Sequence, residues 1–511
     1  MKVVVVLSDK VLSTCCVSAY FCAVNIWHKI PLNQVLPSAK TVEASKEKWA
    51  ALMERKKFTS NQRDELSRAL KRQYRSMECH IEVEKNILLL NDSKTFTVTT
   101  GQQIVTALGP WMVLYKVATA IKLSKDLTGQ FPSYHFVPIF WMATEDHDWM
   151  EIAEIKKGDE HLKWDNPTGG AVGRLSCDTT LDAIERWNAM HPEWLVSDIV
   201  MKAYQDHATL GDATRWLVNQ IFGHQGLVVV DGDDADQKAM VSELFTAELN
   251  EQKLFHIAQS HNCVHGEIEI KPYNVFQLAP GKRLRVQNEI EAQTLLAQND
   301  LASCSPNVAL RIFYQESILP NLAYIGGPSE QKYWNQVAPF FADLNIPQPL
   351  FILRERGVVV PEKWCRKWES LGWNKDQMLH PKECFELDLK IKYGSTEPLR
   401  ELKSSILSAY ASHYERIESE DATLLNAAKG DCVKSIHMVE QLEKKIQRAR
   451  KRKEEETLQF VERWALQVTP KNHLAERWDF WIFEWQKNKH IVDMLIDQMD
   501  WEDPSFKVWS Y

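Results

Sequence analysis

Four consecutive ionisable residues, Glu145, Asp146, His147 and Asp148, follow an apolar run over residues 137–143. A strand that is buried on both faces reads as such a run, and parallel sheets bind ligands beyond the carboxyl ends of their strands. Two carboxylates about 4 Å apart repel by roughly 4 kcal/mol at an effective dielectric of 20, so the cluster needs a cation, a proton or a ligand beside it. A solvated turn before an N-capped helix is the alternative interpretation. We favour a functional site at the end of this strand.

Two further strand ends carry glycine turns. Gly101-Gln102-Gln103 follows a β-rich run over residues 95–100, and its two amides could hydrogen-bond a carboxylate or a sugar beside a helix N-terminus. A routine turn is the other interpretation. Gly326-Gly327 follows residues 322–325 and permits close approach of a phosphate or an adenine ring. Glu330, Tyr333 and Trp334 would project from the next helix turn.

Three polar residues, Asn307, Arg311 and Gln315, are spaced four apart within an otherwise apolar stretch. On a helix they form one stripe leading toward the strand at residues 322–325. A guanidinium matches a carboxylate well, although an arginine on a helix also forms ordinary surface ion pairs. We favour ligand binding.

Several familiar sites are missing from the sequence. No GxGxxG follows a strand and no GxxxxGK[ST] is present, which disfavours dinucleotide oxidoreductases and P-loop enzymes. The ten cysteines form no CxxC pair, and we expect reduced thiols and no bound structural metal.

Five segments alternate with helical stretches, and each reads as a buried strand followed by a polar turn. They lie at residues 95–100, 136–141, 227–230, 322–325 and 349–353. This repetition predicts an α/β fold with an open parallel sheet, which brings the strand-end turns to one edge. Insertions near residues 151–215 and 240–310 would cap that edge. The second contains an expected basic hairpin that includes Asn274 and Arg283.

The two ends of the chain read as helical. Residues 41–90 show helical spacing, and from Leu399 two apolar stripes predict long helices that pair as an antiparallel coiled coil around a break near residues 418–422. We therefore divide the chain into an N-terminal helical region (1–90), a sheet core with insertions (91–395) and a coiled coil with a closing helical segment (396–511).

The composition is that of a globular protein. With 511 residues the chain should form two or three domains, and a formal charge of -8 gives no reason to expect a nucleic-acid partner. The apolar N-terminal stretch is interrupted by Asp9 and Lys10, and no later segment approaches twenty apolar residues. We therefore expect a cytoplasmic location and no membrane contact.

The motifs together resemble the bacillithiol-biosynthesis family of cysteine ligases known as BshC. They keep their order over roughly residues 60–485. The matching positions are Thr100–Gln103, Leu108–Pro110, Tyr115-Lys116, Pro138–Trp141 with Glu145–Asp148, Leu227–Asp231, Asn274–Phe276, Arg283, Asn307-Val308 with Arg311 and Gln315, and Ala323–Pro328 with Glu330 and Tyr333-Trp334.

This resemblance implies a Rossmann-like core with inserted connecting regions, a C-terminal antiparallel coiled coil, and a homodimer formed through it. The implied reaction joins the carboxylate of cysteine to the amine of glucosaminyl-malate, which gives bacillithiol. The family is compared with class I cysteinyl synthetases, yet no HIGH or KMSKS signature is present, and Gly223-His224-Gln225-Gly226 is no substitute. The activation step therefore stays open.

Amide formation needs an activated acyl group, so we expect ATP as cosubstrate, with Mg²⁺ accompanying it, and an acyl adenylate of cysteine. The attacking amine must lose a proton, and His147 with Glu145 and Asp148 is the expected acceptor. Asp146 would bind an ammonium group, and Arg311 with Gln102 and Gln103 would hold the malyl carboxylates. The remaining expected substrate residues are Asn274, Arg283, Asn307 and Gln315, and the nucleotide side would comprise Gly101, Gly326, Gly327, Glu330, Tyr333 and Trp334.

Two other classes of function fit the same pattern. A nucleotidyl- or glycosyl-transferase on this sheet would use similar strand-end turns and would act without cysteine. A non-catalytic dimeric coiled-coil scaffold would show no turnover, but it would not need polar clusters at several strand ends.

Overall fold

The computed structural model describes residues 25–31, 44–165, 169–298, 300–380, 383–386, 389 and 399–511. The expected boundary between residues 395 and 396 lies outside these ranges, as do residues 1–24 of the apolar N-terminal stretch.

The core is a five-stranded sheet in the order β11-β10-β2-β3-β6. All of its neighbouring strands pair in parallel. Its strands are β2 (Thr95–Gln102), β3 (His135–Met142), β6 (Val228–Asp231), β10 (Asn321–Gly326) and β11 (Leu350–Leu353). They are nearly continuous apolar or β-branched runs because both faces of the sheet are covered. The predicted Rossmann-like parallel sheet is confirmed.

The chain reverses direction across this sheet between β2 and β10. It runs outward from β2 through β3 to β6, and then returns to the other side of β2 at β10. The register places Gly101 opposite Trp141 and Thr100 opposite Ile325, so the three central strands end at one level. Ligands bind at such a reversal in open α/β sheets.

Helices cover the sheet. α5 (Trp111–Gln130) is apolar around most of its circumference and packs against β2, β3 and β10, with α24 (Ile491–Gln498) on its outer side. The expected N-terminal helical region forms α2 (Lys46–Arg55), α3 (Ser60–Gln73) and α4 (Ile81–Leu89). α2 contacts β10, whereas α3 and α4 contact β6.

The two insertions form separate small units. The first contains α6 (Trp149–Ile152), β4 (Glu154–Lys157), β5 (Glu160–Lys163), α7 (Asp178–Met190), α8 (Asp198–Asp206) and α9 (Leu210–Phe222). The second contains α10 (Ala235–Met240), α11 (Ser242–Glu251), α12 (Lys253–Ser260), β7 (Val275–Ala279), β8 (Lys282–Arg285), α13 (Glu289–Ala297) and β9 (Cys304–Pro306). β7 and β8 pair in antiparallel fashion around Pro280 and Gly281, so the expected basic hairpin is present. α14 (Val308–Ile318), α15 (Pro328–Val337) and α16 (Phe340–Asp343) follow.

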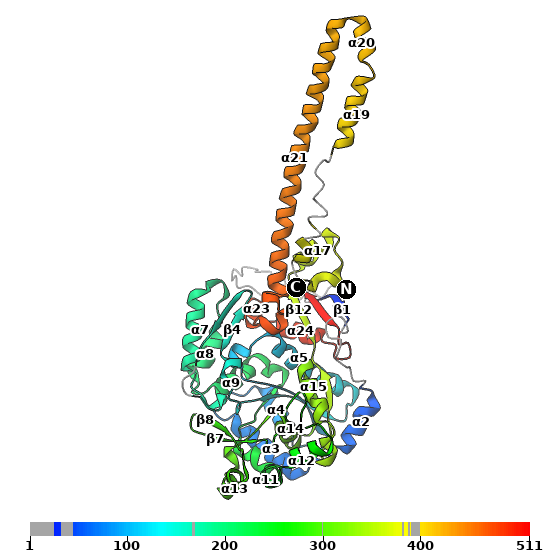
Figure 1. The fold of residues 1–511 in the computed structure, drawn as a ribbon. Helices are drawn as coiled ribbons and strands as arrows, with labels where there is room; N and C mark the ends of the chain where they lie inside the picture. The colour runs from blue at the N-terminus through cyan, green and yellow to red at the C-terminus, as the bar shows by residue number, and fades with distance from the viewer. Residues whose placement is uncertain are drawn as a thin grey trace, which may run out of the picture.

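A stalk of two antiparallel helical arms projects from the body (Figure 1). α19 (Arg400–Ala411) and α20 (Tyr414–Glu420) form one arm, and the long α21 (Ala422–Val468) forms the other. Asp421 lies at the break and caps α21 by accepting a hydrogen bond from the Thr423 N–H at 2.7 Å. The hydroxyl groups of Tyr410 and Ser435 meet across the arms at 3.3 Å. The predicted antiparallel coiled coil and its break are confirmed.

A second sheet at the base of the stalk was not expected from the sequence. Its order is β1 (Asn25–Ile30), β13 (Phe506–Ser510) and β12 (Arg356–Val360), so segments from the start, middle and end of the described chain lie side by side (Figure 1). α17 (Glu362–Leu371) and the lower part of α21 pack on this sheet through Trp368, Phe460 and Trp464. After α21 the chain returns to the body through α22 (Ala475–Trp478) and α23 (Ile482–Lys487).

Candidate active site

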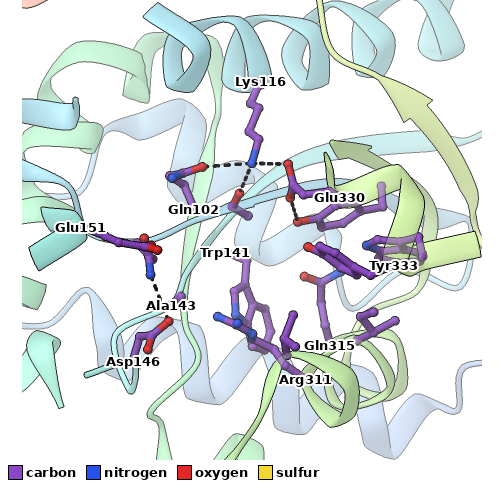
Figure 2. A pocket seen from close by; sticks show the side chains of 16 residues that line it. Gln102, Lys116, Trp141, Ala143, Asp146, Glu151, Arg311, Gln315, Glu330 and Tyr333 are labelled. Carbon is purple, nitrogen blue, oxygen red and sulfur yellow. Dashed lines mark hydrogen bonds and ion pairs between the residues drawn. The ribbon is translucent and has the colours of Figure 1, made fainter. Parts of the chain in front are cut away.

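A cavity of about 260 Å³ lies at the carboxyl ends of β2, β3 and β10, where the chain reverses across the sheet. Helices α5, α14 and α15 and the start of the first insertion complete its walls (Figure 2). The residues expected from the sequence that line it are Gly101, Gln102, Gln103, Asp146, Arg311, Gln315, Glu330, Tyr333 and Trp334. Lys116, Trp141, Ala143, Glu151, Val308, Ile312 and Tyr324 also line it. The parallel sheet thus collects distant segments around one pocket.

One wall is a buried ion pair between α5 and α15. The Nζ atom of Lys116 lies 2.6 Å from Oε2 of Glu330, and it donates to the Gly101 carbonyl at 3.0 Å and to Oε1 of Gln102 at 2.9 Å. The hydroxyl of Tyr324 donates to Oε1 of Glu330 at 2.9 Å. Burial lowers the pKa of Lys116, while the charge of Glu330 opposes this change. Figure 2 shows that these groups form a connected network at one end of the pocket.

The opposite side is acidic. Gln103 donates from Nε2 to Oδ2 of Asp146 at 3.1 Å, and the backbone N–H of His147 donates to Oδ1 at 2.8 Å. Burial raises the pKa of Asp146, but the charges of Arg311 and Arg283 outweigh burial, and the net pKa is lowered. Asp146 is therefore a carboxylate anion at neutral pH.

Glu151 lies at the mouth of the same pocket. Partial removal from water raises the pKa of its carboxyl group, a hydrogen bond from Gln103 opposes this, and repulsion by Asp148 and Asp146 adds to the increase. Glu151 is thus better suited than Asp146 to accept a proton.

Arg311 extends from α14 across the pocket toward the side of Asp146 (Figure 2). Among the residues that the structure describes, none lies within hydrogen-bond or ion-pair distance of its guanidinium. Its nearest opposing charge acts at longer range, where Arg311 lowers the pKa of Asp146. A half-buried, unpaired guanidinium is a binding group for an anion.

An aromatic wall faces the ion pair. The ring of Tyr324 stacks on Trp334 of α15 with centroids 4.6 Å apart, and Tyr333, the partly buried neighbour of Trp334, also lines the pocket. Gln315 follows Arg311 by one helical turn and donates to Glu316 at 3.1 Å. The stripe expected from the spacing of Arg311 and Gln315 therefore faces the pocket.

His147 and Asp148 do not line the cavity and are exposed at its rim. Nδ1 of His147 lies 3.1 Å from Nη1 of Arg283. Because a guanidinium only donates, Nδ1 must be the acceptor, and a neutral imidazole then carries its proton on Nε2. We expected His147 to accept a proton from the substrate. In the structure its unprotonated nitrogen, Nδ1, already accepts from Arg283 and does not face the cavity.

Arg283 reaches this rim from the β7–β8 hairpin. It stacks on Phe276 at 4.0 Å, donates to Ser305 at 3.0 Å and to the Pro306 carbonyl at 2.8 Å, and lies 3.6 Å from Asp146. Most of the N–H groups of Arg283 are therefore already used within the protein. Its contacts indicate that it holds Asp146 in position rather than binding substrate.

Glu145 points away from the cavity, although we expected it to assist catalysis. Its side chain is buried and lies 3.2 Å from Nζ of Lys238, which also pairs with Asp233 at 2.7 Å. Burial raises the pKa of Glu145 to about 7, against the attraction of Lys238. Successive residues of a turn point in different directions, which explains why Asp146 enters the pocket and Glu145 does not.

Asn274 and Asn307 use their polar atoms within the protein. Asn274 donates from Nδ2 to the buried carboxylate of Glu248 at 2.7 Å and accepts from Nδ2 of Asn307 at 2.7 Å. Asn307 in turn caps α14 by accepting from the N–H groups of Ala309 and Leu310 at 3.0 Å. Neither asparagine lines the cavity. They hold the helix that carries Arg311, rather than substrate.

The Gly326-Gly327 turn is closed to a phosphate by the protein itself. The N–H of Gly327 donates to Oε2 of Glu330 at 2.7 Å, so a carboxylate already occupies the N-terminus of α15. Glycine is needed at position 326 for packing, because a Cβ atom there would lie 2.4 Å from the ring of Phe351. The expected phosphate contact at this turn is therefore not supported by the geometry.

Lys116, Glu151 and Tyr324 were not among the expected site residues. Lys116 is the one cation between Trp111 and Ile121, an otherwise largely apolar helical run, and a lysine in that setting needs a buried partner. That signal could have identified it. Glu151 gives no comparable signal, since a glutamate beside three other acidic residues has the same appearance on a solvated turn.

Neither a metal centre nor a membrane span is seen in the described part of the chain. Its His, Cys, Asp and Glu side chains form no group of three or more suited to hold a metal ion. Its helices include none with both the length and the apolar character needed to cross a bilayer.

A Rossmann-like sheet with a charged pocket at its strand reversal, joined to a coiled coil, defines the class of this protein as an α/β protein with a candidate active site for polar ligands. Two family models match the chain. "Bacillithiol biosynthesis BshC, N-terminal Rossmann-like domain" matches residues 38–355, and "Bacillithiol biosynthesis BshC, C-terminal coiled-coil domain" matches residues 357–511.

Similar proteins carry the name "Putative cysteine ligase BshC". One from Flavobacterium johnsoniae is 30% identical over 485 residues, which is 88% of this chain and 90% of that protein. One from Flavobacterium psychrophilum is 33% identical over 443 residues, covering 80% and 81%. One from Cytophaga hutchinsonii is 29% identical over 498 residues, covering 93% and 92%. The chain belongs to the BshC family of bacillithiol biosynthesis. The resemblance and the expected ligase class are thereby confirmed.

Proposed function

We propose that this protein joins the carboxylate of cysteine to the amine of glucosaminyl-malate, as the last step of bacillithiol biosynthesis. Family membership supports the reaction, and one observation in the structure supports its location. The pocket holds the guanidinium of Arg311, which has no partner among the described residues, and the anionic carboxylate of Asp146, on facing sides. Cysteine carries an ammonium and a carboxylate, and the malyl group carries carboxylates, so both substrates complement this pair of charges.

Arg311 would bind a substrate carboxylate, with Gln102 and Gln103 beside it, and Asp146 would bind an ammonium group. Gln102 is held by Lys116 and Gln103 is held by Asp146, so both amides are already oriented before substrate arrives. Preorganised polar groups orient a ligand without a further loss of side-chain entropy.

Glu151 would accept the proton that the attacking amine loses. It lies at the pocket mouth, and its pKa is raised above the ordinary glutamate value by partial burial, which increases its affinity for a proton. His147 is the less suitable base because Arg283 donates to its Nδ1 atom. His147 and Arg283 would instead support Asp146 from the rim.

ATP would supply the activation that an amide bond requires. Arg311 fits a phosphate as well as a carboxylate, and Tyr333 offers a ring face at the pocket. The N-terminus of α15 does not fit a phosphate, because Glu330 occupies it. Mg²⁺ would accompany ATP as a cosubstrate ion.

The test is incubation of the purified protein with cysteine, glucosaminyl-malate and ATP, followed by mass spectrometry of the new thiol. Formation of bacillithiol that requires all three components supports the proposal. Turnover of nucleotide or sugar without cysteine would instead identify a transferase. If the purified protein is folded and binds its substrates but forms no product without any other protein present, the proposal is contradicted.

We also propose a homodimer formed through the stalk and a cytoplasmic location. Leu407, Leu424, Val433 and Met438 expose apolar side chains on the stalk helices, which a second copy could cover. The cysteines of the described chain are free thiols, as expected in a reducing compartment. A V433K/M438E protein should elute and scatter light as a monomer, whereas a wild-type protein that is itself monomeric would contradict the proposed assembly.

A further inference from the structure

The segment that returns from the stalk, Ala475–Trp481, contacts residues that position two walls of the pocket. These residues are Arg354, which holds the turn before α15, and Trp111, which begins α5. It belongs to the part of the chain matched by the coiled-coil family model, whereas the pocket residues belong to the Rossmann-like part. We infer that this segment is a positioning element for the pocket, and that Glu476 is its central positioning residue. The inference deepens the proposed function, since it names what holds the site in shape.

The first contact reaches the wall formed by α15. Glu476 is fully buried and accepts hydrogen bonds from Arg354 at 3.0 and 3.2 Å, from Arg356 at 2.8 and 3.1 Å, and from the Gly357 N–H at 3.2 Å. Arg354 lies at the end of β11, and its own N–H donates to the Gly326 carbonyl at 2.9 Å. Arg354 also packs beside Gly327, because a Cβ atom at position 327 would lie 3.7 Å from Nε of Arg354. Glu476 thus fixes the turn from which Glu330 projects.

The second contact reaches the wall formed by α5. The N–H of Trp111, the first residue of α5, donates to the Asp479 carbonyl at 3.1 Å. Phe480 forms a β-bridge with Pro110, and the indole of Trp481 donates to the Leu108 carbonyl at 3.3 Å. α5 carries Lys116 one and a half turns further on. The two contacts therefore meet at the ion pair between Lys116 and Glu330, which forms one end of the pocket.

Backbone strain gives independent support. Ala107, Leu108 and Gly109 have φ angles of 50°, 63° and 64°, and the first two are residues for which this region is unfavourable. Such strain persists only where surrounding contacts impose it. Here the N–H of Ala107 donates to the hydroxyl oxygen of Tyr204 at 3.0 Å, and the indole N–H of Trp481 donates to the Leu108 carbonyl at 3.3 Å. The strained loop connects Gln103 to α5, so its release would disturb both.

The experiment measures hydrogen–deuterium exchange of the full-length protein without any ligand. Glu476→Gln should speed exchange about tenfold or more in the peptides that cover residues 104–116 and 321–337, because it removes a buried charge from two arginines. Glu484→Gln is the matched control. Glu484 is also buried, lies three residues beyond this segment, and pairs with Lys157 and Lys487. In this variant Lys157 keeps its second partner, the side chain of Asp479, so the main-chain contact between Asp479 and Trp111 should be retained.

Trp481→Phe keeps an aromatic ring at this buried position and removes the indole N–H that donates to the Leu108 carbonyl, so it is the second variant if Glu476→Gln does not fold. It should speed exchange in residues 104–116 and leave residues 321–337 unchanged. In the ligase assay, Glu476→Gln should raise KM about tenfold with a smaller change in kcat, and Glu476→Asp should restore part of the loss.

Equal exchange in wild type, Trp481→Phe and Glu476→Gln at both wall segments would overturn the inference. Equal acceleration by Glu484→Gln would do the same, because the effect would then be a general loss of stability. If the exchange pattern is as expected but wild-type protein makes no bacillithiol, the positioning role stands and the proposed reaction fails.

Discussion

The ammonium of Lys116 lies 2.6 Å from the carboxylate of Glu330, and both side chains are largely withdrawn from water. Lys116 comes from the first helix after β2, and Glu330 comes from the helix after β10. The pair therefore joins the two sides of the strand reversal and forms one end of the candidate active site.

Removing one member of this pair should be costly. Glu330→Gln leaves the Lys116 charge buried without its partner, and we expect a loss of about 3–5 kcal/mol in the free energy of unfolding. The double variant K116M/E330Q should lose less than the sum of the single variants, by 1 kcal/mol or more. Urea unfolding followed by tryptophan fluorescence measures both. Glu362→Gln, which breaks an exposed pair with Arg366, should cost less than about 1 kcal/mol.

Arg311→Gln should weaken substrate binding without unfolding the protein. A charge-assisted hydrogen bond contributes about 1.5–3 kcal/mol, so KM for the carboxylate substrate should rise about 10- to 100-fold. Because the guanidinium has no ion-pair partner among the described residues, the melting temperature should change little. Arg463→Gln, at an exposed arginine of α21, should leave KM unchanged. An unchanged KM in Arg311→Gln would remove Arg311 from the binding site.

Glu151 and His147 can be distinguished as proton acceptors. Glu151→Gln should lower kcat about 10²- to 10⁴-fold, whereas His147→Ala should stay within about threefold of wild type. The pKa of Glu151 is raised, so the acidic limb of the wild-type kcat/KM profile should fall above the ordinary glutamate value of 4.5 and should vanish in Glu151→Gln. The reverse ranking of the two variants would restore His147 as the base.

Acid should destabilise the protein partly through Glu476. Burial alone raises its pKa, but Arg354 and Arg356 outweigh burial and lower the pKa to about 2 from an ordinary value of 4.5. A carboxyl group with a depressed folded pKa contributes stability above its unfolded pKa and loses it as pH falls through the folded pKa. Between pH 5 and pH 2 the wild type should therefore lose roughly 3 kcal/mol more than Glu476→Gln. Parallel stability curves for the two proteins over this range would contradict the assignment.

Asn307 should act on substrate binding only through α14. Asn307→Ala removes the N-cap and should cost about 1 kcal/mol of stability, with a rise in KM because Arg311 lies in the first turns of that helix. Asn307→Asp keeps the cap but cannot donate to Asn274, so it separates the two contacts. If Asn307→Asp matches wild type in both measurements, the contact with Asn274 does not position the helix.

The sequence alone was sufficient for the parallel sheet and for several pocket residues. Strands 95–102 and 135–142 are local signals, since their apolar runs end abruptly at polar turns. The helical spacing of Arg311 and Gln315 is also local. Once the strands are parallel, their carboxyl ends must share an edge, which is why Gln102 and Asp146 meet as expected. Arg311 joins them from α14, the helix that leads back into β10.

Only the tertiary structure decided which side chain at each turn enters the pocket and which is used elsewhere. Glu145 and Asp146 are adjacent and chemically alike, yet one pairs with Lys238 beneath the surface and the other faces Arg311. Likewise Asn274 and Asn307 bond to each other, and β1 pairs with β13 from the opposite end of the chain. Such pairings depend on the direction of each side chain and on contacts between segments that are distant in the sequence. Residue type and local spacing determine neither of these.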